Sequence, residues 1–248
     1  MKSTKKTDAY QVYEHLIEEI QDWPITKFVS KRKAFLQKLN ADVFEQFKLL
    51  GKDEVDQAIA KTMHQEKQRV KTNPWKADPP NEMQYYRRIQ NEYNANQLLS
   101  DKHKGNLETL GRLINRFSQE IMGHFNPKTF LFVRTWSDRL FHTLLFPFKW
   151  TDIFRLKKLK NENRTAILIN GYVSEIRDLF KDHTIVLVPT HSSNLDSICI
   201  GYSIDLSVGL PAFSYGAGLN LFDSEFFAFF MNRLGAYKVD RRKKIQYI

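Results

Sequence analysis

The stretch Thr184-Ile-Val-Leu-Val-Pro-Thr-His-Ser-Ser-Asn-Leu-Asp-Ser-Ile-Cys-Ile-Gly-Tyr-Ser-Ile204 changes its apolar pattern halfway along. Residues 184–189 are mostly β-branched or apolar and end at a proline, which predicts a short buried strand. Residues 195–204 have the pattern of a helix. A strand that leads into a helix is the repeating unit of an α/β layer, whose strands are at least partly parallel.

The flanking sequence continues this alternation. Residues 165–181 predict a helix before the stretch. After it, residues 211–215 predict an extended segment, 224–234 a helix and 236–239 a second extended segment. We therefore expect an α/β domain with a mixed, partly parallel sheet over residues 126–248.

Residues 1–125 show a different pattern, in which apolar residues recur at intervals of three and four. This spacing predicts a helical N-terminal domain. Breaks are expected at Pro24, at Gly51–Asp53 with Asp53 as a candidate helix cap, and at the proline-containing loop 73–81. The helical segments are expected over residues 10–20, 28–39, 85–99 and 107–121.

Aromatic and basic residues are mixed through residues 126–150. The aromatic residues are Phe130, Phe132, Trp136, Phe141, Phe146, Phe148 and Trp150, and the basic residues are Lys128, Arg134, Arg139 and Lys149. Rings and cations together are typical of a segment that lies in the headgroup region of an anionic membrane. The alternative is an aromatic-rich helix that packs into a core.

The chain carries a net charge of +10 over 248 residues, which favours an anionic partner. Anionic lipid, phosphorylated metabolites and nucleic acid all qualify. The nucleic-acid interpretation rests on charge alone, because no recognised nucleic-acid motif occurs, and we expect no such partner. No run of about 18 apolar residues is present, so any membrane contact is expected to be peripheral. The N-terminal residues 1–8 lack the apolar stretch of a secretory signal.

Cys199 is the only cysteine, so an intramolecular disulfide is excluded and a reducing, cytoplasmic location is expected. Its apolar neighbours Ile198 and Ile200 suggest a small core residue. A single cysteine and the absence of His-Glu-x-x-His argue against a zinc site. The absence of Gly-x-Ser-x-Gly argues against a serine hydrolase. We expect neither a metal nor another cofactor.

His191 follows the predicted strand directly, at the carboxyl end where ligands bind in open α/β sheets. Histidine is suited to remove a proton from a hydroxyl group near neutral pH. Asp196 can approach the imidazole if the intervening residues turn into a helix, and would then fix the tautomer. The alternative is that the polar residues between them are turn and cap residues, with His191 a loop histidine.

Glycines and arginines add to this pattern further along the chain. Gly216, Gly218 and Gly235 permit tight backbone geometry at strand ends. Arg241 and Arg242 supply planar guanidinium groups that suit bidentate contacts with phosphate. The alternative for the two arginines is a solvated basic run that extends from Lys238 to Lys244.

Three blocks occur in the order Val-Pro-Thr-His-Ser-Ser-Asn-Leu-Asp (188–196), Ala-Gly-Leu-Asn-Leu (217–221) and Leu-Gly-Ala-Tyr-Lys-Val-Asp-Arg-Arg (234–242). Together they resemble the glycerolipid acyltransferase family, which acylates glycerol 3-phosphate or 1-acylglycerol 3-phosphate (lysophosphatidate) and carries the pattern His-x-Ser-x-x-Asp. The second and third blocks are similar to the glycerol-3-phosphate branch, whereas Ser192 stands where that branch usually has arginine. The resemblance covers residues 184–244.

The resemblance implies a role for each matching residue. His191 would be the general base, Asp196 its orienting partner and Ser193 the small polar residue of the pattern. Arg242, with Arg241, would bind the phosphate of the acceptor. The acyl donor would be the thioester of acyl-CoA or acyl-carrier protein, with no metal or covalent intermediate, and the enzyme would work at an anionic membrane surface in phospholipid biosynthesis.

Two further blocks of the family are absent, one of which resembles Phe-Pro-Glu-Gly followed by an arginine. We therefore expect a helical N-terminal domain over residues 1–125 and, over residues 126–248, an incomplete α/β acyltransferase domain that is truncated at its C-terminus. The chain would be an acyltransferase or an inactive fragment of one. The alternative is a noncatalytic membrane- or partner-binding protein that retains the acyltransferase scaffold.

Overall fold

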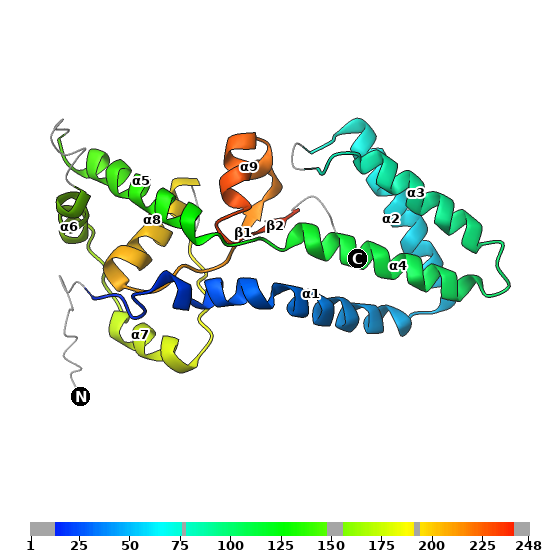
Figure 1. Ribbon diagram of the computed structural model, residues 1–248, viewed down its shortest axis with the longest axis horizontal. Coiled ribbons are helices and arrows are strands. Elements are labelled where there is room, and N and C mark those ends of the chain that lie inside the picture. The colour runs from blue at the N-terminus through cyan, green and yellow to red at the C-terminus, as the bar shows by residue number, and fades with distance from the viewer. Residues whose placement is uncertain (1–12, 76–77, 148–155, 191–193, 241–248) are drawn as a thin grey trace. The chain divides into compact units, whose positions relative to one another are not determined.

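The computed structural model describes residues 13–75, 78–147, 156–190 and 194–240, which are mostly helical (Figure 1). Contacts divide the chain into two compact units. The first unit contains residues 1–28 and 126–213, and the second contains residues 29–125 and 214–248. The predicted boundary at residue 125 is therefore one of the points where the chain passes between units. The division into two consecutive domains stays a prediction.

The helices of the second unit confirm the helical prediction for most of residues 24–125. They are α1 Pro24–Lys48, which belongs to this unit from Val29 onward, α2 Lys52–Thr72, α3 Glu82–Asn96 and α4 Lys102–Ile121. Pro24 begins α1, where its fixed φ suits a first helical position. The predicted cap Asp53 is wrong, because Gly51 occupies the cap position and its N–H donates to Glu54 Oε2 at 2.9 Å.

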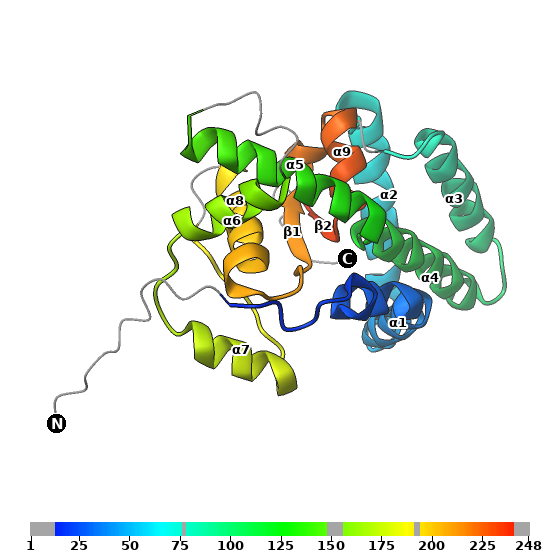
Figure 2. The same ribbon diagram turned by 60° about the vertical axis from the view of Figure 1, so that its left-hand side comes forward.

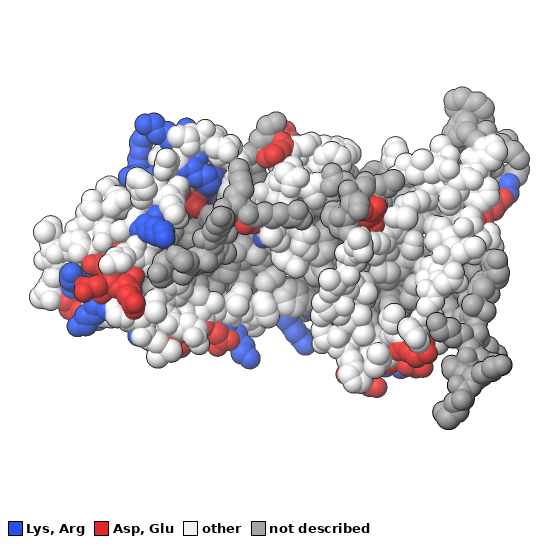
Figure 3. Space-filling view, turned by 180° about the vertical axis from the view of Figure 1, so that it is seen from behind, with Lys and Arg blue, Asp and Glu red and all other residues white. Residues whose placement is uncertain are grey.

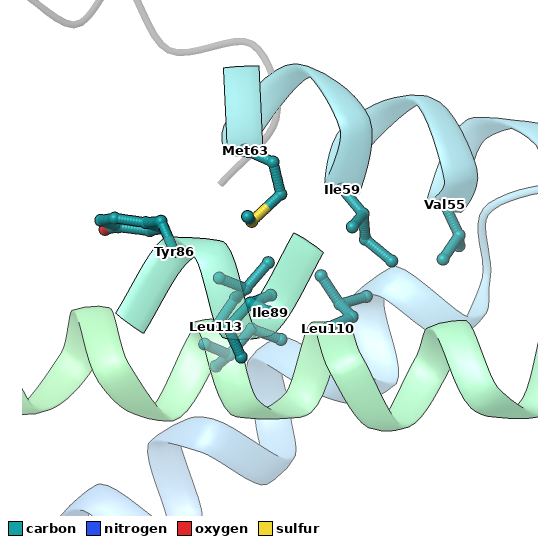
Figure 4. Close-up of a cluster of buried hydrophobic side chains, with 8 residues drawn as sticks. Val55, Ile59, Met63, Tyr86, Ile89, Leu110 and Leu113 are labelled. Atoms are coloured by element: carbon teal, nitrogen blue, oxygen red, sulfur yellow. The ribbon is translucent and has the colours of Figure 1, made fainter. Parts of the chain in front are cut away.

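The apolar core of the second unit is formed by the facing sides of α2, α3 and α4. Figure 4 shows side chains from all three helices pointing toward one another. The buried residues are Val55, Ile59, Met63, Tyr86, Ile89, Leu110, Leu113 and Ile114. The spacing of three and four residues is the pattern that predicted the helices at 85–99 and 107–121, which correspond to α3 and α4, whereas α2 had no predicted range of its own.

A small parallel sheet completes the second unit. Strand β1 (Tyr215–Gly218) pairs with β2 (Ala236–Val239) in a register that joins Tyr215 to Ala236 and Gly218 to Val239. The connection contains the 3₁₀ turn η4 (Leu219–Phe222) and helix α9 (Glu225–Met231). Figure 2 shows α9 beside the two strands. This strand–helix–strand unit confirms the predicted parallel arrangement and the extended segment 236–239. Of the extended segment predicted at 211–215, only Tyr215 lies in a strand.

The chain after α4 lies against β2. The N–H of Gly235 donates to the carbonyl of His124 at 2.7 Å, and Phe125 forms an antiparallel bridge with Leu234. A Cβ atom on Gly123 would overlap the carbonyl oxygen of Ala236. The absence of a side chain at Gly123 therefore allows the end of α4 to approach the strand.

The longer elements of the first unit are all helices. These are α5 Pro127–Leu145, α6 Leu156–Ala166, α7 Val173–Asp182, α8 Asn194–Ser203 and the π-helical turn η3 Ile204–Val208. Helix α8 confirms the helix predicted at 195–204. The single helix predicted at 165–181 is wrong, since α6 ends at Ala166 and α7 begins at Val173. Gly171, with φ at 133°, lies in the interruption, in a conformation that favours glycine.

Residues 13–19 also differ from the predicted helix. They form an irregular segment that is followed by the short turn η1 (Ile20–Asp22). The N–H of Tyr13 donates to the carbonyl of Ser207 at 3.3 Å, and that of Leu16 donates to Gly209 at 2.8 Å. These tertiary hydrogen bonds take the place of helical ones, so the contact with η3 overrides the local apolar spacing.

Two further predictions near residue 190 are wrong. Residues 184–190 form no strand and are largely exposed, with Val186 at 77% and Val188 at 88%. A buried strand requires a ladder partner and cover on both faces, which composition alone does not supply. Cys199 is exposed on α8 rather than part of a core.

Helix α5 contains most of the aromatic segment, for which we considered a membrane interface and a core helix. It has both buried and exposed aromatic side chains. Phe141 is buried and stacks on Tyr202 with ring centroids 4.4 Å apart, and Phe130 meets Trp23 edge to face. Phe132 and Trp136 are exposed on another side of the same helix. Residues 148–150 lie outside the described residues. Part of the segment is therefore core, and membrane contact by the rest stays a prediction.

Candidate functional site

A cavity of about 210 Å³ lies at the carboxyl ends of the two strands in the second unit. Parallel pairing brings Gly218, which ends β1, and Val239, which ends β2, to the same edge. Three segments line the cavity: residues 73–75, residues 218–220 with Asp223, and residues 239–240. Ligands of open α/β layers bind at this edge, so the cavity is the candidate ligand site of this unit.

The loop that follows α2 supplies one wall of the cavity and is held by Arg69. The Arg69 guanidinium lies 3.8 Å from the centroid of the Trp75 ring, and its Nη1 donates to Asp78 Oδ2 at 2.7 Å. Asp78 Oδ2 also accepts from the backbone N–H of Trp75 at 2.8 Å. Arg69 Nε donates to the buried Glu66 at 2.8 Å. Two carboxylates raise the pKa of Arg69 and keep it charged, although burial acts in the opposite direction.

The opposite wall begins in β1 and turns at η4. The N–H of Asp223 donates to the carbonyl of Asn220 at 3.4 Å, which closes this turn. Lys238 of β2 lies over the Phe222 ring, with Nζ 5.4 Å from its centroid, and burial lowers the pKa of Lys238. Neither Phe222 nor Lys238 lines the cavity.

Two of the three predicted glycines have local structural reasons. Gly235 has φ at 83°, a conformation that L residues rarely adopt, and it begins the approach to β2. A Cβ atom on Gly216 would lie 3.1 Å from the hydroxyl of Tyr237 on the neighbouring strand. Gly218 ends β1 and lines the cavity.

The predicted catalytic residues are described only in part. Asp196 lies in the first turn of α8 and is half-buried. The other predicted site residues, His191, Ser193, Arg241 and Arg242, lie outside the described residues. The contact of His191 with Asp196 and the phosphate contact of the arginines therefore stay predictions. Asp240, which precedes Arg241 in the sequence, lines the cavity.

The first unit contains a buried polar cluster that the sequence did not predict. The Tyr202 hydroxyl donates to Asp138 Oδ1 at 2.7 Å and accepts from Asn163 Nδ2 at 2.9 Å. Asn163 also donates to the carbonyl of Asp138 at 2.8 Å. Burial raises the pKa of Asp138, with the Tyr202 hydrogen bond acting against it. These bonds join α5, α6 and α8 into one network.

A second polar group in this unit surrounds Asp205 on the π-helical turn. Arg134 Nε lies 2.7 Å from Asp205 Oδ2, and His15 Nε2 lies 3.3 Å from Oδ1. His15 stacks on Trp23 with ring centroids 5.1 Å apart. Arg134 belongs to α5 and His15 to the N-terminal segment. The Asp205 carboxylate therefore links α5 and the N-terminal segment to η3.

The sequence did not single out Asn73–Trp75 or Asp223 as cavity residues. Asn-Pro-Trp at 73–75 was recognised as a loop, and Asp223-Ser224 stands at a helix start. Both are ordinary turn sequences. Only the pairing of β1 with β2, and the position of the α2–α3 loop beside them, makes these residues neighbours.

Charged residues do not form one continuous patch on the face drawn in Figure 3. There, Lys and Arg stand in small groups beside Asp and Glu, with uncharged surface between them. No group of three or more His, Cys, Asp or Glu suited to hold a metal ion occurs among the described residues. In the same part of the chain, no helix has the length and apolar character needed to cross a membrane.

Comparisons with models of known protein families, with curated proteins and with solved structures find no match to this chain.

Proposed function

We propose that the protein is a glycerolipid O-acyltransferase that moves a fatty acyl group from acyl-CoA or acyl-carrier protein to a hydroxyl of glycerol 3-phosphate or 1-acylglycerol 3-phosphate. The observation that carries the proposal is the ordered set of three sequence blocks. The second block contains the end of β1 and the third contains β2, and the cavity lies at the carboxyl ends of both strands. This position supports the proposal because α/β layers bind ligands there.

In this proposal His191 accepts the proton of the acceptor hydroxyl while its oxygen attacks the thioester carbonyl. The carbon–sulfur bond then breaks, and the thiolate leaves with the proton that His191 returns. Asp196 orients the imidazole and stabilises its charged form, with Ser193 as the small polar neighbour. Arg241 and Arg242 bind the phosphate of the acceptor through paired N–H donors.

The test is acyl transfer from long-chain acyl-CoA to each of the two acceptors by the whole chain and by its His191→Ala variant. Loss of a general base lowers the rate by about 10²–10⁴-fold. The matched control is His64→Ala, because His64 is exposed on α2 and belongs to none of the three blocks. Equal turnover numbers for His191→Ala and the unchanged protein would contradict the assignment of the base.

Exposed aromatic residues on α9 support membrane contact within the same proposal. Phe226 is 66% exposed and Phe227 is 53% exposed, although both are large apolar side chains. Together with the net charge of +10, they suit an anionic bilayer, into whose interface aromatic rings insert. They also support the second candidate, a noncatalytic membrane-binding protein on the same scaffold.

Sedimentation with phosphatidylglycerol-containing vesicles tests this contact. The double change Phe226→Gln with Phe227→Gln is expected to weaken binding about tenfold or more, because each ring transfers on the order of 1.5–3 kcal/mol of apolar free energy. Leu98→Gln is the control, since Leu98 is exposed in the turn after α3. Equal binding by both variants would count against α9 as the contact. Binding without any acyl transfer would favour the noncatalytic candidate.

A further inference from the structure

Three basic side chains of the second unit lie close together where the chain after α4 meets the approach to β2. Arg32 of α1 donates from Nε to the carbonyl of Gly123 at 3.4 Å. His124 is the next residue, and its carbonyl accepts the N–H of Gly235 at 2.7 Å. Arg233 lies two positions before Gly235. These two hydrogen bonds bring both arginines near the exposed side chain of His124.

The charges of the two arginines act on the imidazole. Desolvation lowers the pKa of His124, and Arg32 and Arg233 act in the same direction. No carboxylate opposes them there, so the three groups form a cluster of one sign.

Backbone carbonyls rather than carboxylates balance this cluster. Among the described residues, no Asp or Glu forms an ion pair with Arg32, His124 or Arg233. The other residues of this unit, 76–77 and 241–248, include no Asp or Glu. The carboxyl end of a helix carries only about half of one negative charge. The cluster therefore keeps an excess of positive charge, which favours an anionic ligand.

Several N–H donors of the two arginines remain for such a ligand, since a guanidinium has five. Arg32 donates from Nε and Nη2 to carbonyls within residues 119–123, and its Nη1 forms no hydrogen bond with the described residues. Arg233 donates from Nη1 to the carbonyl of Phe229 at 3.1 Å, and its Cζ lies 3.8 Å from the centroid of the Phe229 ring. These contacts hold both groups in place, so less freedom is lost when a ligand binds.

The number and kind of these donors suit a phosphate monoester. Such a group carries about 1.5 to 2 negative charges near neutral pH and has three strong acceptor oxygens. Guanidinium groups bind phosphate through paired N–H donors. A charged imidazole adds a further donor on the same ligand.

We propose that Arg32, His124 and Arg233 form a binding site for a phosphate monoester, either free or in the headgroup of a lipid. The site uses other residues than Arg241 and Arg242 and does not depend on acyl transfer, so it goes beyond the proposed function. If the ligand is a lipid, the Phe229 ring, which is 47% exposed beside Arg233, is placed to meet its apolar part.

NMR of the histidine rings, recorded on the whole chain during titration with sodium sulfate, tests the site. Sulfate resembles a phosphate monoester in shape and charge, but its charge stays constant between about pH 6 and 8, where histidine titrates. Bound sulfate is expected to raise the pKa of His124, because an anion favours the charged imidazole. The affinity for sulfate is therefore expected to be highest at low pH and to fall as the pH rises.

Arg233→Gln is expected to lower the affinity for sulfate about tenfold or more, because hydrogen bonds between charged groups are lost. Arg88→Gln is the matched control. It removes the same charge from the same unit, at an exposed arginine of α3 that lies over the Tyr85 ring. If Arg233→Gln does not fold, His124→Gln decides the question, since its exposed side chain can change without loss of packing. It is expected to abolish the pH dependence of the sulfate affinity.

Sedimentation with vesicles distinguishes the two sources of the ligand. The headgroup of phosphatidic acid is a phosphate monoester, whereas that of phosphatidylglycerol is a diester. A preference for phosphatidic acid vesicles that Arg233→Gln abolishes would assign the ligand to a lipid. Sulfate binding together with equal binding to both kinds of vesicle would assign it to a free phosphate monoester.

Two results would overturn the site. Equal affinities for sulfate in Arg233→Gln and Arg88→Gln would show that only net charge matters. A pKa of His124 that sulfate leaves unchanged would show that the anion binds elsewhere. Neither result involves acyl transfer, so this site can fail while the proposed function stands, and the reverse.

Discussion

Glu120, near the end of α4, is a carboxyl group whose protonation is set by its surroundings. Burial raises its pKa from 4.5 to about 7, although Arg116 on the preceding turn acts in the opposite direction. Arg116 also pairs with Glu82 of α3 at 2.5 Å, so the two carboxylates share one cation. Sharing limits how far Arg116 can favour the charged form of Glu120.

The unfolding free energy is expected to depend on pH through Glu120. Because its pKa is higher in the folded protein than in the unfolded chain, its contribution is complete below pH 4.5 and is lost as the pH rises through about 7. The loss is at most about 3 kcal/mol. Urea denaturation between pH 4.5 and 7.5 measures this slope.

Glu120→Gln removes the titrating group and is expected to flatten that slope. Glu45→Gln provides the comparison, since Glu45 is an exposed carboxyl on α1 whose 2.7 Å ion pair with Lys48 lies at the surface, where such pairs contribute little to stability. If the two variants show the same pH dependence, the slope comes from other groups and the role given to Glu120 is wrong.

Gly209 shows how a single backbone position joins two elements. It follows the π-helical turn with φ at 69°, and its carbonyl accepts from the N–H of Leu16. A Cβ atom at Gly209 would lie 2.5 Å from the carbonyl oxygen of Glu14. The segment around Leu16 can therefore lie against η3 only because residue 209 has no side chain.

Gly209→Ala is expected to lower the unfolding free energy by about 1–3 kcal/mol, since it adds backbone strain and a clash with main-chain atoms. Gly201→Ala is the control inside α8, where a Cβ atom would meet nothing within 4 Å. The control is expected to stabilise the protein by up to about 1 kcal/mol. Thermal unfolding of both variants decides the matter, and equal midpoints would contradict this account of Gly209.

The helices were predictable where an apolar face repeats over several turns. Leu110, Leu113 and Ile114 of α4 have this spacing, and they lie in the core. The predicted helix over residues 165–181 was wrong because apolar spacing continues across Asn170-Gly171, where the backbone turns. The predicted strand at 184–189 was wrong because strand formation depends on partners that local composition does not specify.

The candidate site was less predictable than the helices. The sequence identified Gly216, Gly218 and Gly235 from their conformational freedom. The positive φ of Gly235 and the close approach at Gly216 accord with this, whereas Gly218 has an ordinary extended backbone. It did not identify Asn73, Trp75 or Asp223 as cavity residues. Local patterns report the periodicity within one segment. The cavity depends instead on how the chain brings together residues 73–75 and residues 218–240, which are about 150 positions apart in sequence.

Across the whole chain, the two units are interleaved in sequence. The second unit combines residues 29–125 with residues 214–248, and the first unit combines the N-terminal residues with 126–213. Contacts of such long sequence separation require closure of long loops before they stabilise the fold. The core of α2, α3 and α4 joins segments within residues 52–121, whereas the bridge between Phe125 and Leu234 closes a longer loop. The helical bundle is therefore expected to form before β2 docks.

The exposed segment 184–188 has a consequence for handling the protein in solution. Thr184-Ile-Val-Leu-Val188 has high β-propensity and no charge, and such windows act as templates for cross-β self-association when solvent reaches them. Val186→Lys is expected to slow the growth of light scattering at high protein concentration and to leave the unfolding midpoint unchanged, whereas Leu98→Lys alters neither. We therefore expect these five residues to set how long a concentrated solution of the protein stays free of aggregates.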